Sequence, residues 1–357
     1  MNTIIIKVDE HNLRAKDLEA AAGILREGGL VAFPTETVYG LGANALDASA
    51  ARKIYEAKGR PSDNPLIVHI SEAADLEILA REIPDKAYQL ANVFWPGPLT
   101  IILKKRDCVP YGTTGGLDTV AIRLPANQIA RSLIAASGVY VAAPSANLSG
   151  KPSPTKAEHV IKDMSGKIDM IIDGGMATLG LESTIIDLSG RFPVILRPGC
   201  ITRAMLENVI GEVEVDPAVL NREPDPQIAP KAPGMKYRHY APEGKLTIYE
   251  GETALVVNAI NQKAKEKQDC GKCVGVIATD ETKALYRYGT VKTIGSRNNE
   301  ASIAAGLYAI LREFDELHTE YIYTESFADN SLGHAIMNRL LKAAGYRIVR
   351  VAEGGKS

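Results

Sequence analysis

Short apolar runs separated by turn-forming residues characterise the first two hundred positions of the chain. Runs of strand length fall at residues 30–33, 66–70, 99–103, 119–124, 139–143, 170–172, 183–188 and 194–196. Apolar residues spaced three or four positions apart predict helices over residues 15–27, 48–57, 73–81, 84–93, 126–136 and 202–209. So many strands, with helices inserted irregularly, predict an α/β domain built on a twisted, mixed sheet rather than a regular doubly wound one.

The pattern changes after residue 244, where strands and helices alternate strictly. Strands are predicted at residues 246–249, 274–278, 290–294, 321–323 and 348–351, and helices at 252–268, 280–287, 300–317 and 332–344. This alternation predicts a smaller, Rossmann-like domain with a parallel sheet. Because the G-x-G-x-x-G fingerprint is missing from the sequence, a dinucleotide site is not indicated.

Between these two regions the periodicity disappears and prolines recur. We therefore predict a first domain over residues 1–212, an extended proline-rich linker over 213–244, and the second domain over 245–357. The linker ends in an unusual cluster of aromatic and basic residues, Lys236, Tyr237, Arg238, His239 and Tyr240. A free tether has no need for such residues, so we predict that this segment closes as a lid over a bound ligand.

Composition narrows the class of protein. A chain of 357 residues, 45% hydrophobic and 24% charged, is typical of a globular protein with two cores. Its start lacks a basic region followed by a long apolar core, so neither a signal peptide nor a membrane span is expected. A formal charge of -2 argues against a protein that mainly holds nucleic acid, although a local basic patch stays possible.

Four cysteines are too few for a disulfide framework in a chain of this length and favour a reducing cytoplasm. Cys270 and Cys273 have the spacing of a redox or zinc motif, but a second ligand pair is missing from the sequence. A surface loop is the favoured interpretation of this pair, and Cys108 and Cys200 receive no role. We predict no metal site formed by the protein itself.

Candidate chemistry begins where the strand at residues 31–33 stops at Pro34. The segment PTETVYGLG, residues 34–42, carries the hydroxyls of Thr35 and Thr37 in what we interpret as a glycine-rich turn. After one predicted helix, KGRPSDNPL at residues 58–66 sets Lys58 and Arg60 in a proline-fixed loop. This combination suits a small polar ligand with a phosphate group, although a solvated loop is the alternative for an isolated pair of cations.

Further cations lie at strand ends, where α/β proteins place ligands. Arg123 ends an apolar strand and Arg197 ends another, and a guanidinium suits the two oxygens of a carboxylate. Polar loops at residues 142–154, 180–184 and 196–199 add hydroxyls and amides. P-loop, H-E-x-x-H and G-x-S-x-G motifs are missing from the sequence, so we expect catalysis by positioning and charge stabilisation.

These motifs together resemble the YrdC-like threonylcarbamoyl-AMP synthases in their long, two-domain form. The resemblance covers most of residues 10–210, and KYRHYAP at 236–242 and SLGHAIMNR at 331–339 extend it to the last third. It implies that L-threonine is surrounded by Thr37, His69, Arg123, the backbone around Ala143, and Ser183. It implies that ATP is held by Arg60, Asn64, Thr119, Ser145, Ser153, Arg197 and a linker tyrosine, Tyr240 or Tyr237. Lys58, Arg60, Ser62 and Asn64 match the catalytic set of the family.

The resemblance also implies the reaction and its partners. L-threonine, bicarbonate and ATP, the last with Mg²⁺, would give threonylcarbamoyl-AMP and pyrophosphate. The product would pass to a separate transferase that modifies the adenosine beside the anticodon of tRNA. His69, taken alone, would be a hydrogen-bonded core histidine, and only the resemblance favours a ligand contact.

Two other functions stay open on the sequence. YrdC-like domains can bind double-stranded RNA, but the acidic charge balance and the missing aromatic RNA-stacking motif argue for at most weak RNA binding. Carbamoyl transfer by a related domain of hydrogenase maturation is the other alternative. The acylphosphatase and zinc segments expected in that case are missing from the sequence.

Overall fold

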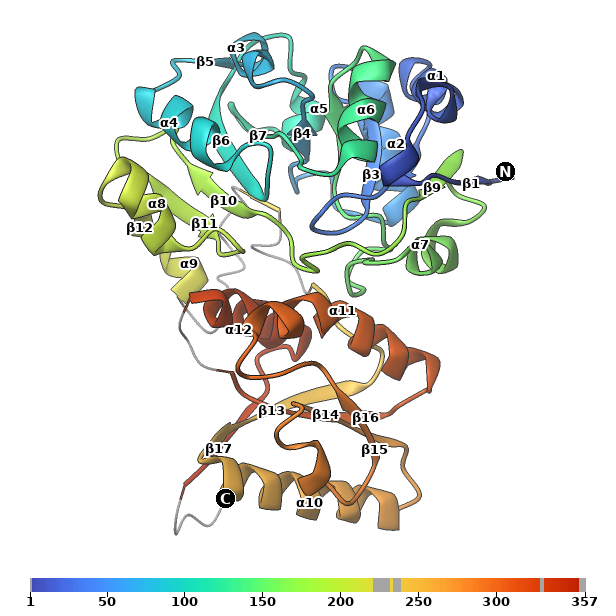
Figure 1. Cartoon of the computed structure of the whole chain (residues 1–357), viewed down its shortest axis with the longest axis vertical. Coiled ribbons are helices and arrows are strands. Elements are labelled where there is room, and N and C mark those ends of the chain that lie inside the picture. The colour runs from blue at the N-terminus through green and yellow to red at the C-terminus, as the bar shows by residue number, and fades with distance from the viewer. Residues whose placement is uncertain (1, 221–231, 234–238, 328–330, 353–357) are drawn as a thin grey trace. The chain divides into compact units, whose positions relative to one another are not determined.

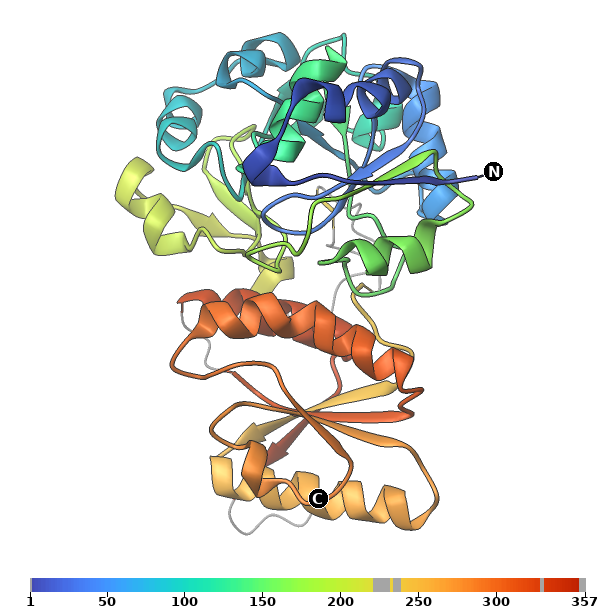
Figure 2. The ribbon, with the colours of Figure 1, turned by 45° about the vertical axis from the view of Figure 1, so that its right-hand side comes forward.

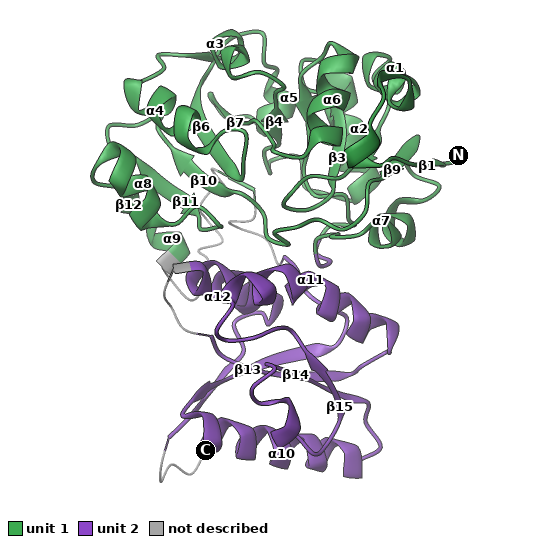
Figure 3. Ribbon diagram, in the orientation of Figure 1, with its two compact units in different colours: residues 1–149, 153–237 green, residues 150–152, 238–357 purple. Residues whose placement is uncertain are grey.

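The structure, a computed structural model, describes residues 2–220, 232–233, 239–327 and 331–352. The chain separates into two compact units (Figure 3), one formed by residues 1–149 and 153–237 and the other by residues 150–152 and 238–357. The short segment 150–152 joins the second unit through the backbone, since Ala241 N donates to Gly150 O at 2.9 Å. Among the described residues, no helix combines the length and hydrophobicity needed to cross a bilayer.

The first unit is built on a 12-stranded mixed sheet (Figure 1). Its strands are β1 (Ile4–Lys7), β2 (Val31–Phe33), β3 (Gly40–Asn44), β4 (Ile67–His69), β5 (Ala80–Arg81), β6 (Leu99–Lys105), β7 (Thr119–Arg123), β8 (Val141–Ala142), β9 (Met170–Asp173), β10 (Thr184–Asp187), β11 (Val194–Arg197) and β12 (Glu214–Val215). They follow the order β1-β9-β2-β3-β8-β4-β7-β6-β10-β11-β12, and β5 pairs with β6. The sheet contains parallel pairs such as β4 with β7 and antiparallel ones such as β6 with β7, which confirms the predicted mixed sheet.

Helices lie around this sheet. They are α1 (Glu19–Arg26), α2 (Ala48–Lys58), α3 (Leu76–Leu79), α4 (Asp85–Phe94), α5 (Tyr111–Thr114), α6 (Gln128–Ser137), α7 (Ala157–Met164), α8 (Arg203–Ile210) and α9 (Pro217–Leu220). The α2 helix has clear start and stop signals: the Asp47 side chain accepts from Ser49 N, and Gly59 follows its last residue with φ 61°. This left-handed stop turns the chain directly into the loop that carries Arg60, and Lys58, predicted in that loop, is the last residue of α2.

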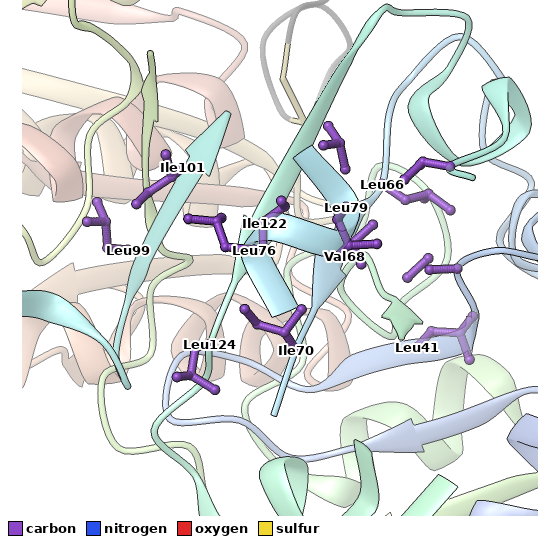
Figure 4. Close-up of a cluster of buried hydrophobic side chains, with 14 of the residues drawn as sticks. Leu41, Leu66, Val68, Ile70, Leu76, Leu79, Leu99, Ile101, Ile122 and Leu124 are labelled. Carbon is purple, nitrogen blue, oxygen red and sulfur yellow. The ribbon is translucent and has the colours of Figure 1, made fainter. Parts of the chain in front are cut away.

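Alternation along the central strands divides their side chains between two faces. Val68 and Ile122 point into the main hydrophobic core, where Leu41, Leu99 and Ile101 also lie (Figure 4). Because successive strand residues point to opposite faces, the neighbours of Val68 and Ile122 face the other side of the sheet. That side carries a small apolar cluster of Ile67, Ile102, Ala121, Ile185, Leu196 and Ala232. His69 on β4 and Arg123 on β7 point to this same side of the sheet.

The segment interpreted as a glycine-rich turn is partly a strand. Residues 40–44 form β3, which pairs antiparallel with β2 and β8. A Cβ at Gly42 would lie 2.7 Å from the Val141 side chain and 2.8 Å from Phe33. The glycine is therefore needed for close packing between strands, and the low β propensity of glycine hid the strand from the sequence.

The second unit has a five-stranded parallel sheet in the order β15-β14-β16-β13-β17. The strands are β13 (Lys245–Gly251), β14 (Val274–Ala278), β15 (Thr290–Thr293), β16 (Tyr321–Glu325) and β17 (Ile348–Val351). One face is covered by α10 (Thr253–Asp269) and the other by α11 (Glu300–Glu316) and α12 (Ser331–Ala343) (Figure 2). This confirms the predicted Rossmann-like domain. The helix predicted over residues 280–287 is only one 3-10 turn, Lys283–Leu285.

The proposed linker differs from an extended tether at its start. Residues 214–220 form β12 and α9, and β12 extends the sheet by pairing with β11. Ala232 is fully buried in the first unit, in the apolar cluster described above. Residues 221–231 and 234–238, which include the predicted Tyr237, lie outside the described residues. Prolines do not prevent short elements here, because Pro217 occupies the first position of α9, where no amide is required.

Candidate functional site

Arg123 and His69 form the centre of the candidate site. They are paired in register on the neighbouring parallel strands β7 and β4, so their side chains share one face. Arg123 is 4% exposed, and its guanidinium donates to Thr37 Oγ1 at 3.0 Å and to Gly97 O at 3.3 Å. Three predicted threonine-binding residues, on three separate segments, are thus brought together.

Glu36 is the residue of this group that the sequence argument missed. Its Oε1 accepts from Arg123 Nη2 at 2.6 Å, while its buried Oε2 has no hydrogen-bond partner among the described residues. Burial alone would raise the pKa of Glu36, but the charge and hydrogen bond of Arg123 outweigh it and hold the pKa below its usual value. The ion pair is therefore charged, and a carboxylate already occupies part of the guanidinium. A buried arginine requires a charged partner, and this requirement was the signal in the sequence that an acidic residue pairs with Arg123.

His69 is a neutral imidazole. Burial, followed by the positive charge of Arg123, lowers the pKa of His69 to about 3. Its Nδ1 lies 3.1 Å from Ile67 O, and its ring meets Phe33 edge to face at 6.3 Å between centroids. A neutral imidazole beside a guanidinium suits recognition of a hydroxyl rather than of a second negative charge.

A second buried group joins Ser183 to Arg197. Ser183 is fully buried, with its hydroxyl 2.7 Å from Thr100 Oγ1, and Arg197 donates from Nη2 to the same hydroxyl at 3.0 Å. Arg197 also donates to Ser183 O at 3.0 Å and, at 3.5 Å, to Pro233 O of the linker. The structure thus links Ser183, a predicted threonine-binding residue just before β10, to Arg197, a predicted ATP-binding residue at the end of β11.

Lys58 connects the cationic loop to the polar loop after β8. Its ammonium, on a side chain only 2% exposed, donates to the backbone oxygens of Ser145 and Asn147. The Ser145 hydroxyl in turn donates to Asn147 Oδ1. Gly40 forms an isolated bridge with Ser145, so this loop is also tied to the threonine-bearing loop between β2 and β3.

Arg60 and Asn64 shape the cationic loop itself. Arg60 donates to Asn64 O at 3.3 Å and to Pro65 O at 3.1 Å, and it is 9% exposed. Asn64 is buried and its Oδ1 has no hydrogen-bond partner within the described part of the chain. Ser62, by contrast, is exposed. A fixed loop with an unsatisfied buried amide oxygen is a site prepared for a further donor.

The remaining predicted residues are more dispersed. The Ser153 hydroxyl donates to Glu182 Oε1 at 2.6 Å, beside Ser183 in the sequence. Ala143 uses its N–H to bond Ile67 O at 2.8 Å, which fixes the end of β8 next to His69. Thr119 begins β7 opposite Lys104, four residues before Arg123, so it lies at the other end of that strand.

Tyr240 belongs to the second unit. It is buried, with a left-handed φ of 64°, and its ring lies 5.2 Å from that of Tyr308 on α11 and 5.5 Å from that of His239. A non-glycine residue rarely adopts this backbone conformation, so the packing around the ring determines it. The structure thus shows the linker's end anchored by an aromatic stack, and the contact with ATP stays a prediction.

The arrangement in the first unit suits anionic ligands. Four cations, Lys58, Arg60, Arg123 and Arg197, are each less than a tenth exposed and surrounded by hydroxyls and carbonyls. Among the described residues, no group of three His, Cys, Asp or Glu side chains is arranged to hold a metal ion. Such a set can hold carboxylate and phosphate oxygens and stabilise charge that develops on them.

Comparisons with known proteins agree with this chemistry. A profile of the Sua5, YciO and YrdC family, described as "Telomere recombination", matches residues 23–199. A second profile, described as "Threonylcarbamoyl-AMP synthase, C-terminal domain", matches residues 201–345.

Full-length relatives are similar over both units. Threonylcarbamoyl-AMP synthase of Pyrococcus abyssi is 50% identical and the match covers 98% of this chain and 100% of that protein. The Bacillus subtilis enzyme of the same name is 50% identical, over 96% of this chain and 97% of its own. The crystal structure of P. abyssi Sua5 complexed with L-threonine matches with a TM-score of 0.92 and 50% identity, over 98% of this chain and 100% of that one. This chain therefore belongs to the threonylcarbamoyl-AMP synthase family, in its two-domain Sua5 form.

Proposed function

We propose that the chain is an L-threonylcarbamoyladenylate synthase, a nucleotidyltransferase that converts L-threonine, bicarbonate and ATP into threonylcarbamoyl-AMP and pyrophosphate. The observation that carries this proposal is the buried group of Arg123, Thr37 and neutral His69 on one face of the sheet. It occurs in a chain that is half identical to a relative solved with L-threonine.

Arg123 would hold the threonine carboxylate. A guanidinium binds a carboxylate through two parallel N–H bonds, and here it is already oriented by Thr37 and Gly97. Because Arg123 Nη2 donates to Glu36, the substrate carboxylate must displace or share that contact. Neutral His69, Thr37 and Ser183 would then surround the rest of the amino acid, with His69 and Thr37 reading its hydroxyl.

The other cations would hold ATP. Arg60, Asn64, Ser145, Ser153 and Arg197 offer donors on loops that the structure ties together, and Thr119 would contribute from the start of β7. Lys58, with its ammonium directed at the Ser145 loop, would stabilise the charge that develops on the phosphates.

Mg²⁺ would enter with ATP. The described residues provide no three-ligand metal cluster, and Mg²⁺ commonly binds through substrate phosphates and water. We therefore assign the ion to the substrate rather than to a resident site.

The chemistry needs positioned reactants more than an acid and base pair. The threonine amine adds to CO₂ derived from bicarbonate, losing a proton and giving an N-carboxylate. One carboxylate oxygen of this group then attacks the α-phosphorus of ATP, and the bond to the bridging oxygen breaks as pyrophosphate leaves. Buried cations lower the barrier because they are oriented before charge accumulates on the leaving group.

The activated threonylcarbamoyl group would go to a separate transferase and from there to the adenosine beside the anticodon of tRNA. A cytoplasmic location follows from this role and from the low cysteine content. The linker would act as a lid, with Tyr240 or Tyr237 covering the nucleotide and shielding the labile carbamate and mixed anhydride from water.

Product analysis tests the proposal. Purified protein is incubated with L-threonine, ATP, Mg²⁺ and ¹³C-labelled bicarbonate. The nucleotides are then separated by chromatography and their masses are determined by mass spectrometry. We expect an adenylate that contains threonine and one labelled carbon. Unlabelled threonyl-AMP would indicate an ordinary amino-acid adenylase, and the absence of any adenylate would contradict the proposal.

A further inference from the structure

The second unit contains a cavity that the proposed reaction does not use. It has a volume of about 450 Å³ and lies between α10 and the starts of β13, β16 and β17. Its lining residues are Lys245, Thr247, Tyr249, Lys263, Lys267, Tyr321, Tyr323, Tyr346, Arg347, Ile348 and Val349. A cavity of this size falls within the range of small-molecule sites.

The lining is strongly biased in charge. Four of its members are cations, and of the described residues that form it, none is Asp or Glu. Lys263 and Lys267 lie one turn apart on α10, and Lys245 and Arg347 come from the strand side. On the rim, Lys263 also pairs with Glu266 at 2.7 Å, so Glu266 partly offsets one of the four charges. In a chain with a formal charge of -2, this is a local basic patch.

The four tyrosines give the cavity its second property. In the described part of the chain, no hydrogen-bond partner is found for the hydroxyls of Tyr249, Tyr321, Tyr323 and Tyr346. These hydroxyls are not fully buried. Burial raises the pKa of Tyr249, Tyr323 and Tyr346, so these phenols remain donors. They therefore offer donors to a bound group.

The rings are held in place. Tyr249 and Tyr323 pack edge to face at 5.9 Å, and the Lys267 ammonium lies 4.6 Å from the centre of the Tyr321 ring. Tyr346 adopts a left-handed backbone, with φ 59°, directly after Gly345 at φ 56°. This conformation is unstrained at Gly345 but costly at Tyr346, whose half-buried ring lies at the cavity, and such strain is typical of functional positions.

Cations, phenol donors and aromatic faces together select one chemistry. An anion with several acceptor oxygens satisfies the first two, and a flat heterocycle satisfies the third. We propose that this cavity binds a nucleoside phosphate, either as a free nucleotide or as one unit of a single-stranded RNA. The site is separate from the residues assigned to ATP in the first unit, and the proposal does not depend on the proposed reaction.

A charge-matched pair of variants tests the site in the full chain. The pocket variant carries Lys245→Gln and Lys267→Gln. The control variant carries Lys265→Gln and Lys272→Gln, which remove the same charge from exposed lysines that pair with Asp269 and Glu320 outside the cavity. Exposed or half-exposed lysines tolerate this change, and equal melting temperatures verify folding.

The probe is a fluorescein-labelled single-stranded oligoribonucleotide of about ten nucleotides, followed by fluorescence anisotropy. We expect the pocket variant to bind about tenfold more weakly than the wild type and to lose about one unit of salt slope per lysine, while the control changes less than about twofold. Equal losses in both variants, or binding by the pocket variant that matches the wild type, would overturn the proposal.

Competition by AMP distinguishes the two sources of the ligand. A cavity for free nucleotides predicts that AMP displaces the oligoribonucleotide, whereas a cavity for RNA predicts that it does not. Either outcome supports the site if the pocket variant is impaired. If neither the oligoribonucleotide nor AMP binds the wild type more tightly than the pocket variant, the cavity is not a nucleoside phosphate site.

A second pair of variants tests stacking. Tyr321→Phe keeps the aromatic face, whereas Tyr321→Leu removes it. We expect the leucine variant to lose about fivefold more affinity than the phenylalanine variant, because base stacking on an aromatic ring contributes about 1 kcal/mol or more. Equal affinities would remove the stacking part of the proposal. Pyrophosphate release from ATP is measured in parallel and should be unchanged in both.

Discussion

The two units carry positive charge in different ways. In the first, Lys58, Arg60, Arg123 and Arg197 are each less than a tenth exposed and held by carbonyls, hydroxyls or a carboxylate. In the second, Lys263 and Lys245 are exposed and Lys267 is only half-buried. Burying a cation costs free energy that only fixed partners offset, so the first arrangement is rigid and specific. The second is adaptable, and substitutions there should have smaller effects.

Substrate selection by the first unit should give the largest effect. A site that hydrogen-bonds a hydroxyl rejects analogues that lack it, because its buried polar groups are then unpaired. We predict that valine and 2-aminobutyrate are used at least about a hundredfold less efficiently than threonine, measured as kcat/KM for pyrophosphate release. Comparable efficiency for either analogue would mean that His69 and Thr37 do not read the hydroxyl.

The Arg123→Lys variant tests the rigidity of the buried cation. Lysine keeps the charge but lacks the planar pair of donors, and the contacts with Thr37 and Gly97 would be lost. We expect a loss of about 1.5 to 3 kcal/mol in threonine binding, measured by calorimetry. The matched control in the second unit is Arg350→Lys, which alters an exposed pair with Glu250 and should leave binding unchanged. Unchanged binding in Arg123→Lys would make this residue structural.

Glu36→Gln should change binding and stability in opposite directions. The carboxylate competes with threonine for Arg123, so its neutral analogue should lower the Kd for threonine by about threefold or more. The buried guanidinium then lacks its charged partner, and the free energy of unfolding should fall by about 1 to 3 kcal/mol. Calorimetry and urea unfolding measure the two quantities. Weaker threonine binding would instead indicate that Glu36 positions Arg123.

His69 makes the first unit sensitive to acid. Burial and then Arg123 lower the pKa of His69 to about 3, so below about pH 6.5 the unfolded chain binds a proton that the folded chain does not. The contribution of His69 to stability is therefore present above pH 6.5 and is lost as the pH falls towards 3. When the pH is lowered from 7 to 5, we predict that the free energy of unfolding falls by about 2 kcal/mol less in His69→Gln than in the wild type. Parallel urea curves with equal losses would contradict a neutral His69.

The linker tyrosines should give the smallest effect, because Tyr240 is anchored in the second unit. Replacing Tyr237 and Tyr240 by alanine should raise the KM for ATP a few-fold and release more AMP per threonylcarbamoyl-AMP formed, as expected for a lid. Chromatography of both products measures this ratio. If KM and product ratio are both unchanged, the segment is only a spacer. Tyr288 is partly buried and packs against a hydrophobic cluster of the second unit. Tyr288→Ala therefore controls for general destabilisation.

Strong periodicity was enough to predict most of the fold. The strand Val274–Ala278 and the helix Ala48–Lys58 match their predicted ranges to within one residue, because apolar spacing and caps agree there. The β3 strand was missed because its glycines, required by close contacts with Phe33 and Val141, reduce strand propensity. The helix predicted after β14 was wrong, since Thr279 and Thr282 hydrogen-bond to each other and Thr282 donates to Glu325 instead.

The sequence named several residues that the structure brings together around Arg123, but it missed Glu36 and gave no geometry. Arg123 ends an apolar strand, and its need for a partner was evident from the sequence. That the partner is Glu36, and that Ser183 joins Thr100 and Arg197, depends on strand order and register, which local patterns do not encode. The cavity of the second unit was missed for the same reason, since its cations come from α10 and from two strand starts.

Pyrophosphate release with single omissions tests the central claim most directly. The wild-type chain is assayed with ATP alone, with threonine or bicarbonate added singly, and with both, in buffer freed of dissolved CO₂. The account predicts release only when threonine and bicarbonate are present together, and its near loss in Arg123→Lys under the same conditions. Release that needs neither, or threonine alone, would contradict a synthase that carboxylates threonine before it reacts with ATP.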